Sequence, residues 1–190
     1  MEAFTISTAS IAVGELGDKT QLLTLILAAR LRKPIPIIAG IFVATLVNHL
    51  GACLVGEWVG KLITPEILRW VLGISFLAVA AWALIPDKLN EDVKTRSHYG
   101  VFVLTAVTFF LAEMGDKTQI VAMALAAKYN DLFSVVAGTT LGMMLVNVPT
   151  VLFAERATKW IPVKLVRIIA AAIYAVLGVV TLLGYGLRMA

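Results

Sequence analysis

The chain has 190 residues, of which 60% are hydrophobic and 15% are charged. A soluble domain averages about 45–50% apolar and about 25% charged residues, so the composition excludes an ordinary soluble protein and indicates an integral membrane protein. The net charge of +4 is too modest to suggest nucleic-acid binding, and the single cysteine, Cys53, excludes an internal disulfide or a thiolate metal cluster within one chain.

Six apolar stretches have the length of about 20 residues that a helix needs to cross a bilayer. They cover residues 3–29, 35–59, 65–85, 99–127, 132–154 and 162–187. They are too long and too uniformly apolar for the strands of a membrane barrel, which alternate over about 10 residues. We therefore predict an all-α polytopic membrane protein with six transmembrane helices.

A charged motif occurs twice within these apolar stretches. Residues 15–21 read ELGDKTQ, and residues 113–119, 98 positions later, read EMGDKTQ. Outside the two motifs, neither the first nor the fourth apolar stretch carries a charge. An ionisable group at bilayer depth costs roughly 2.5–3.5 kcal/mol on insertion scales, so such groups are expected to be functional.

The two halves of the chain also match beyond the motif. Gly40 corresponds to Gly138 at the same offset of 98, and Asn48 corresponds to Asn147 at an offset of 99. Because each repeat would contain three helices, an odd number, the second copy would enter the membrane from the opposite face. We predict two inverted three-helix repeats, residues 1–86 and 99–190, joined by a polar cytoplasmic linker at residues 87–98.

The motif places several polar groups at helical spacing. On one continuous helix, Glu15, Asp18 and Lys19 would share a face, since residues three and four apart are neighbours. Thr20 and Gln21 add neutral oxygens. Gly17 has two interpretations: it lets a facing helix approach closely, or it loosens the helix so that carbonyl oxygens turn toward a ligand. The second copy offers the same groups, with Gly115, Lys117, Thr118 and Gln119 at the equivalent positions.

An inverted repeat would bring the four acids Glu15, Asp18, Glu113 and Asp116 together. Lys19 and Lys117 would balance two of their charges, which leaves about two negative charges for one divalent cation or for two protons. Oxygen ligands suit Ca²⁺, Mg²⁺ or Mn²⁺ and argue against Cu⁺ or Zn²⁺. The predicted metal ligands are the four acids together with side-chain oxygens of Gln21, Gln119, Asn48 and Asn147.

The twin Glu-x-Gly-Asp-Lys-Thr motif in a protein of this size resembles the cation/proton antiporter family. That family includes the Golgi manganese and calcium transporter and bacterial manganese exporters, and it is grouped with the calcium/cation antiporter and lysine exporter superfamily. The resemblance covers essentially the whole chain. It implies export of Mn²⁺ or Ca²⁺ against a proton gradient, with Glu15, Asp18, Glu113 and Asp116 as the acidic residues that bind the ion and carry the protons. It implies no cofactor and no enzymatic activity.

Several polar residues have a structural interpretation beside the functional one. Lys19 and Lys117 are expected to orient and neutralise the acids rather than touch substrate. Asn48 and Asn147 are either ion ligands or interhelical hydrogen-bonding groups. His49 has no counterpart in the second half; a proton relay is one interpretation, and a packed, hydrogen-bonded histidine is the favoured one.

The charge distribution also predicts orientation. Loops after the first, third and fifth stretches hold ten Lys and Arg residues, and the opposite side holds four. The ten-charge side is expected to be cytoplasmic, with both termini outside, in the inner membrane of a bacterium. A homodimer is considered as the oligomeric state.

Competing functions are a Ca²⁺/proton antiporter, an exporter of cationic amino acids, a passive cation channel and an intramembrane hydrolase. A channel needs weak sites that release ions quickly, which four buried acids do not resemble. No hydrolase signature is present in the sequence.

Overall fold

The computed structural model describes residues 1–85, 100–153 and 163–184. These residues form helices connected by short turns, and no strand is found among them. The helices are α1 (Glu2–Glu15), α2 (Lys19–Leu31), α3 (Pro34–Leu62), α4 (Pro65–Ala83), α5 (Gly100–Glu113), α6 (Lys117–Tyr129), α7 (Leu132–Leu152) and α9 (Val163–Leu182). The all-α prediction is confirmed for this part of the chain, and the predicted linker at residues 87–98 lies outside it.

Three of the described helices, α3, α4 and α7, are long and apolar enough to cross a membrane. Helix α5 and the part of α9 that spans residues 168–182 are also apolar, but they are shorter. The first and fourth apolar stretches are not continuous helices, because each is divided at its motif, into α1 and α2 and into α5 and α6. The expectation of one unbroken helix through each motif is therefore wrong.

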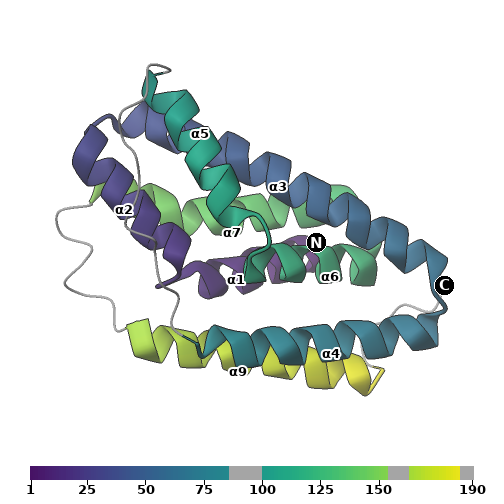
Figure 1. The fold of residues 1–190 in the computed structure, drawn as a ribbon. Helices are drawn as coiled ribbons and strands as arrows, with labels where there is room; N and C mark the ends of the chain where they lie inside the picture. The colour runs from purple at the N-terminus through teal and green to yellow at the C-terminus, as the bar shows by residue number, and fades with distance from the viewer. Residues whose placement is uncertain (86–99, 154–162, 185–190) are drawn as a thin grey trace.

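The helices pack so that both motifs lie inside the bundle. In Figure 1, α4 and α9 lie side by side along one edge, and α3 runs along the opposite edge. Between them, α1 and α6 cross the middle, with α1 packed on α7 and α6 packed on α3. The breaks after α1 and α5 consequently meet near the centre of the structure, far from either end of α3.

Close helix contacts recur at equivalent places in the two halves. A Cβ added to Gly40 on α3 would lie 2.8 Å from Thr105 Cβ and 2.9 Å from the Phe102 carbonyl oxygen on α5. On α7, a Cβ added to Gly138 would lie 2.5 Å from the Phe4 carbonyl oxygen on α1. Phe4 precedes Phe102 by the same 98 positions that separate the two glycines. Small residues allow such close backbone packing, which drives helix association where lipid is as apolar as the side chains.

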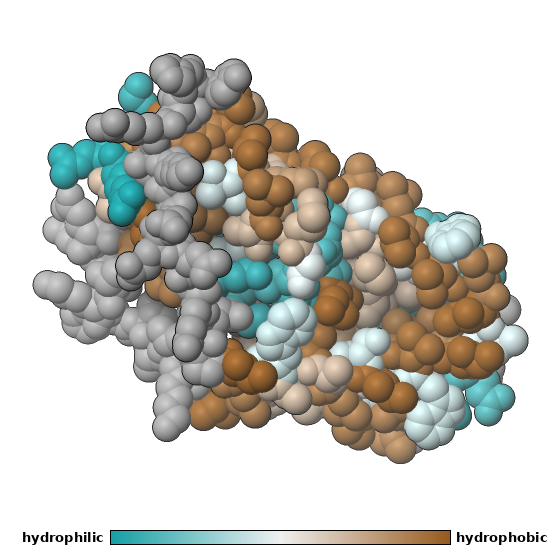
Figure 2. Space-filling view, viewed as in Figure 1, coloured by the Kyte–Doolittle hydropathy of each residue, from teal (hydrophilic) through white to brown (hydrophobic). Residues whose placement is uncertain are grey.

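The outer surface is apolar, as a lipid-facing surface must be. Large hydrophobic side chains are exposed along most helices, among them Trp58 on α3, Leu111 on α5 and Phe133 on α7. Figure 2 shows hydrophobic residues over much of one face, with hydrophilic residues gathered near its centre. The charged groups of the two motifs, in contrast, lie inside the bundle: Glu15, Asp18, Glu113, Asp116 and Lys117 are all buried.

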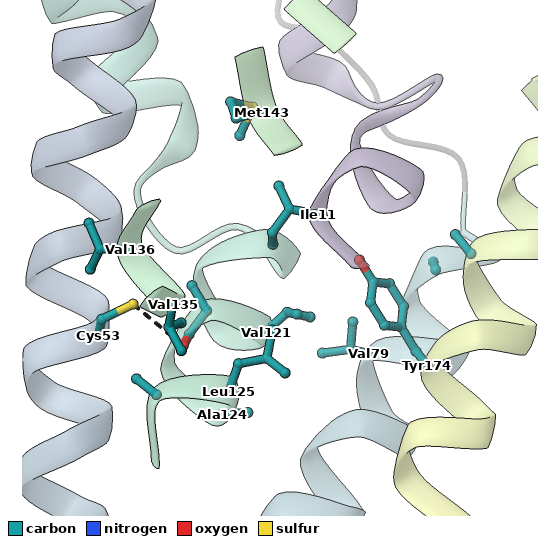
Figure 3. Packing of buried hydrophobic residues seen from close by; sticks show 14 of the residues in the cluster. Ile11, Cys53, Val79, Val121, Ala124, Leu125, Val135, Val136, Met143 and Tyr174 are labelled. Atoms are coloured by element: carbon teal, nitrogen blue, oxygen red, sulfur yellow. Dashed lines mark hydrogen bonds between the residues drawn. The ribbon is translucent and has the colours of Figure 1, made fainter. Parts of the chain in front are cut away.

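The buried apolar core surrounds the motifs. Figure 3 shows Ile11, Val121, Leu125 and Met143 pointing into the space between α1, α6 and α7. On one side of this core, the thiol of Cys53 donates to the Ala122 carbonyl oxygen over 3.6 Å, which ties α3 to α6. Dense packing of this kind holds the ends of the broken helices in place, because cores are not freely deformable.

Candidate functional site: a buried cluster of acids at two helix breaks

Each motif breaks its helix at the glycine. Gly17 and Gly115 both have φ of 77°, in the left-handed region that L side chains rarely adopt. As a result, the motif glutamate is the last residue of the first half-helix, and the motif aspartate caps the start of the second. Of the two sequence interpretations of Gly17, the structure shows the loosened helix.

The motif glutamines stabilise these breaks. Gln21 Oε1 accepts a hydrogen bond of 2.6 Å from the Gly17 amide, and Gln119 Oε1 accepts one of 2.7 Å from the Gly115 amide. The Gly17 amide is buried and needs such a partner, since an unpaired buried amide is costly, whereas Gly115 is exposed. Both oxygens were predicted as metal ligands, and the structure gives each of them a structural bond within its own motif.

Three of the four motif acids come together. One carboxylate oxygen from each of Glu15, Glu113 and Asp116 lies within 4.8 Å of the other two, and all three residues are buried. Thr20 Oγ1 donates to Glu15 Oε2, whereas neither oxygen of Glu113 has a hydrogen-bond partner among the described residues. We call these three residues the acid triad. Such a cluster in a dry interior requires a cation or protons to offset its charge.

The lysines pair with aspartates of the other motif. Lys19 Nζ lies 3.0 Å from Asp116 Oδ1, and Lys117 Nζ lies 2.8 Å from Asp18 Oδ1. Each ion pair therefore links residues about 98 positions apart and joins the two broken helices. The expectation that the lysines neutralise the acids agrees with this arrangement, although the partner of each lysine is not in its own motif.

Asp18 occupies a different place from the other acids. It is buried and paired with Lys117, but it contributes no oxygen to the acid triad. Both residues line a small pocket between the first helix break and the helices α4 and α9. The other residues that line this pocket are Gly14, Leu16, Gly17, Ala83 and Ala170. The structure thus gathers three of the four predicted acids in one cluster and places the fourth at an adjoining pocket.

The two asparagines make hydrogen bonds to neighbouring helices. Asn48 Nδ2 donates to the Phe110 carbonyl oxygen on α5 over 3.1 Å. Asn147 Oδ1 accepts from Thr24 Oγ1 on α2 over 2.7 Å. Its Nδ2 donates to the Met143 carbonyl oxygen within α7 itself, over 3.0 Å. Of the two interpretations, the structure contains the interhelical hydrogen bonds.

His49 is completely buried on α3, as a packed histidine would be. Neither of its ring nitrogens, however, has a hydrogen-bond partner among the described residues. The expectation of a packed histidine therefore agrees with the structure, and the expectation that it is hydrogen-bonded does not.

Sequence reasoning missed two groups that touch the site. Tyr174 on α9 is buried, and its hydroxyl donates to the Ser10 carbonyl oxygen on α1 over 2.8 Å. Figure 3 shows the ring of Tyr174 with its hydroxyl directed toward α1. The residue 98 positions earlier is Phe76, so a comparison of the repeats would have revealed this added hydroxyl. Thr24 was also missed; its equivalent in the second half is Ala122.

The half-helix ends explain why this site suits cations. Glu15 and Glu113 lie at the C-termini of α1 and α5, where the helix macrodipole is negative. Asp18 and Asp116 lie at N-termini, where a carboxylate is favoured. Full ionisation of the four acids and two lysines leaves two negative charges, which matches one divalent ion.

Comparisons with known proteins identify the family of this chain. The family model described as "Divalent cation/proton antiporter GDT1" matches residues 3–91 and 101–187. A protein of Vibrio cholerae named "Putative manganese exporter" is 49% identical over 184 residues, which cover 95% of this chain and 90% of the relative. A GDT1-like protein of Synechocystis is 26% identical over 211 residues, covering 95% of this chain and 97% of the relative. No solved structure matches the chain.

Proposed function

We infer that this chain, because it belongs to the GDT1 family of divalent cation/proton antiporters, exports Mn²⁺ from the cytoplasm in exchange for protons. The family is one of transporters rather than of enzymes. The observation that carries the proposal is the acid triad, in which three buried carboxylates approach within 4.8 Å of one another. A site of this kind can hold either one divalent cation or protons, and the exchange between them is antiport.

The choice of Mn²⁺ rests on the ligands and on the relative. All candidate ligands are oxygens, which suit hard divalent ions such as Mn²⁺ and Ca²⁺. The relative that shares 49% identity carries manganese in its name, so Mn²⁺ is the first substrate and Ca²⁺ the alternative. The proposed ligands are the acid triad and Asp18. The side-chain oxygens of the motif glutamines and of the two asparagines complete the proposed set: Gln21, Gln119, Asn48 and Asn147.

We propose alternating access between two inverted three-helix repeats. The repeats are residues 1–86 and 99–190, close to the two segments that the family model matches. The equivalent contacts of Gly40 with α5 and Gly138 with α1 support this division, because each repeat packs its second helix on the broken helix of the other. Rocking one repeat against the other would then expose the site to each side in turn.

The proposed location is the bacterial inner membrane. The excess of Lys and Arg on the loops after the first, third and fifth apolar stretches places that side in the cytoplasm and both termini outside. Export then means movement of Mn²⁺ from the lysine-rich side toward the side of the termini, with protons moving inward.

Proteoliposomes with an acidic interior test the proposal. We expect Mn²⁺ to accumulate inside, because protons leaving down their gradient drive the ion inward. Glu113→Gln should abolish this uptake, while Glu57→Gln, the same change at an exposed ion pair on α3, should leave it intact. Mn²⁺ flux that ignores the pH gradient would end the antiport proposal, and flux that survives Glu113→Gln would end the assignment of the acid triad. Competition by Ca²⁺ or by lysine ranks the alternative substrates.

A further inference from the structure

We propose that Lys19 is a tethered cation that competes with the transported ion for Asp116, and that Lys117, at the same position of the other motif, does not. The inference rests on the proposed function, because it assumes that a divalent ion binds the acid triad. It assigns different roles to two residues that the sequence presents as equivalent.

The first argument is the shared carboxylate. Asp116 belongs to the acid triad and is also the ion-pair partner of Lys19, whose Nζ lies 3.0 Å from Oδ1. An ion that enters the triad must therefore share Asp116 with an ammonium group already beside it. Lys117 instead pairs with Asp18, which gives no oxygen to the triad. The carboxylate that pairs with Lys117 is therefore not one that an ion in the triad must share.

The second argument is the freedom of each lysine. The side chain of Lys19 is 24% exposed, whereas that of Lys117 is 7% exposed. The partial exposure leaves Lys19 room to move its charged group away from Asp116 on its long, flexible stem. Lys117 is enclosed together with Asp18, and separating that pair would leave two buried charges uncompensated.

The third argument is local electrostatics. Lys19 is the first residue of α2 and Lys117 the first of α6, so each cation lies at the positive end of a helix macrodipole. Helix stability alone disfavours lysine at these positions. We explain the lysine at position 19 by its ion pair with Asp116. Residues that local helix stability disfavours are found most often where function requires them.

The consequence is weaker binding of a doubly charged ion. A positive charge beside the triad repels a divalent cation twice as strongly as it repels a proton at the same distance. Lys19 therefore lowers the affinity for the ion more than the affinity for protons and favours release of the ion when protons arrive. Removal of the Lys19 charge should tighten Mn²⁺ binding by at least about tenfold. It should also slow transport, because the bound ion then dissociates from the site more slowly.

The test is a titration of the purified, full-length protein in nanodiscs with Mn²⁺ alone. The spectrum of free Mn²⁺ by electron paramagnetic resonance reports the unbound ion, at a mildly alkaline pH where protons compete little. Lys19→Gln is compared with wild type, with Lys117→Gln and with Lys61→Gln, which removes the same charge from an exposed ion pair at the end of α3. Lys19→Met serves if the glutamine variant does not fold.

The inference is supported if Lys19→Gln tightens Mn²⁺ binding at least about tenfold, Lys61→Gln leaves it unchanged and Lys117→Gln tightens it less. Unchanged or weaker binding by Lys19→Gln overturns it. Equal tightening by Lys117→Gln overturns the distinction between the two lysines. If wild-type protein binds no Mn²⁺, the proposed function itself fails; binding by wild type with no effect of Lys19→Gln refutes the competition alone.

Discussion

Replacement of Gly115 by alanine isolates the energetic cost of the helix break. Gly115 has φ of 77°, and a Cβ added there would meet no atom within 4 Å. The cost therefore comes from the left-handed backbone alone, roughly 1–2 kcal/mol for an L residue with a side chain. For a chain of this size, each kcal/mol lowers Tm by about 2–4 °C, so we expect a fall of about 2–8 °C.

Gly51 provides a matched control for this substitution. It lies within α3, and an added Cβ there also meets no atom within 4 Å. Because alanine is favoured over glycine in a helix by about 0.5–1 kcal/mol, Gly51→Ala should raise Tm by about 1–4 °C. The same added methyl group should thus have opposite effects at the two positions.

Thermal unfolding of the detergent-solubilised protein, followed by intrinsic tryptophan fluorescence, measures both shifts. Gly115→Asn should lose less than Gly115→Ala, because asparagine tolerates the left-handed region better than other non-glycine residues. The alanine variant should also transport poorly, since Glu113 and Asp116 flank the break. Equal Tm shifts for Gly51→Ala and Gly115→Ala would refute the reasoning that the break is a strained backbone position.

Three further predictions concern single side-chain contacts. Gln21→Leu leaves the buried Gly17 amide unpaired and also removes the bond from Gln21 Nε2 to Thr150 Oγ1. It should cost about 1–3 kcal/mol and lower Tm more than Gln119→Leu does, because Gly115, the partner of Gln119, is exposed; equal losses in the two variants would contradict this reasoning. Tyr174→Phe should lower Tm by about 1–6 °C through loss of the bond to Ser10. It should also partly restore the Tm of Gly14→Ala, whose added Cβ would lie 2.0 Å from the Tyr174 hydroxyl. If the Tm shifts of the two single variants simply add in the double variant, this contact is not the cause. Hydrogen bonds from Ser134, first from its side chain and then from its amide, lower the pKa of the Asp131 carboxyl, which lies in the connection before α7. Asp131→Ala should therefore destabilise by about 1 kcal/mol at most at neutral pH, and the difference in Tm from wild type should vanish as acid protonates Asp131 below its folded pKa; a difference that persists in strong acid would show another cause.

The helix breaks illustrate where sequence reasoning stopped. Gly17 carried both interpretations, close packing and a loosened helix, because a glycine permits either. The glutamine four residues later turned out to hold the freed amide of the break in both motifs. That bond depends on a backbone turn that hydropathy does not record, so the glutamine oxygens were taken as ligands instead.

The asymmetry of the site was equally hidden. The two motifs differ in sequence only at Leu16 and Met114, yet Asp116 joins the acid triad and Asp18 does not. Asn48 and Asn147 likewise bond to different kinds of partner on neighbouring helices, a carbonyl in one case and a threonine hydroxyl in the other. For the asparagines a difference in the sequence is visible: the hydroxyl that bonds to Asn147 belongs to Thr24, whose equivalent in the second half is Ala122.

Composition and pattern alone were enough to indicate a membrane protein with a duplicated acidic motif, because hydropathy and motif spacing are local properties of the chain. The family of cation antiporters came from the resemblance that this motif carries. Only the tertiary structure decided that each lysine pairs with the aspartate of the other motif and that three acids, not four, share one cluster. Those pairings join residues about 98 positions apart, and their geometry is set by how the broken helices pack against α3 and α7.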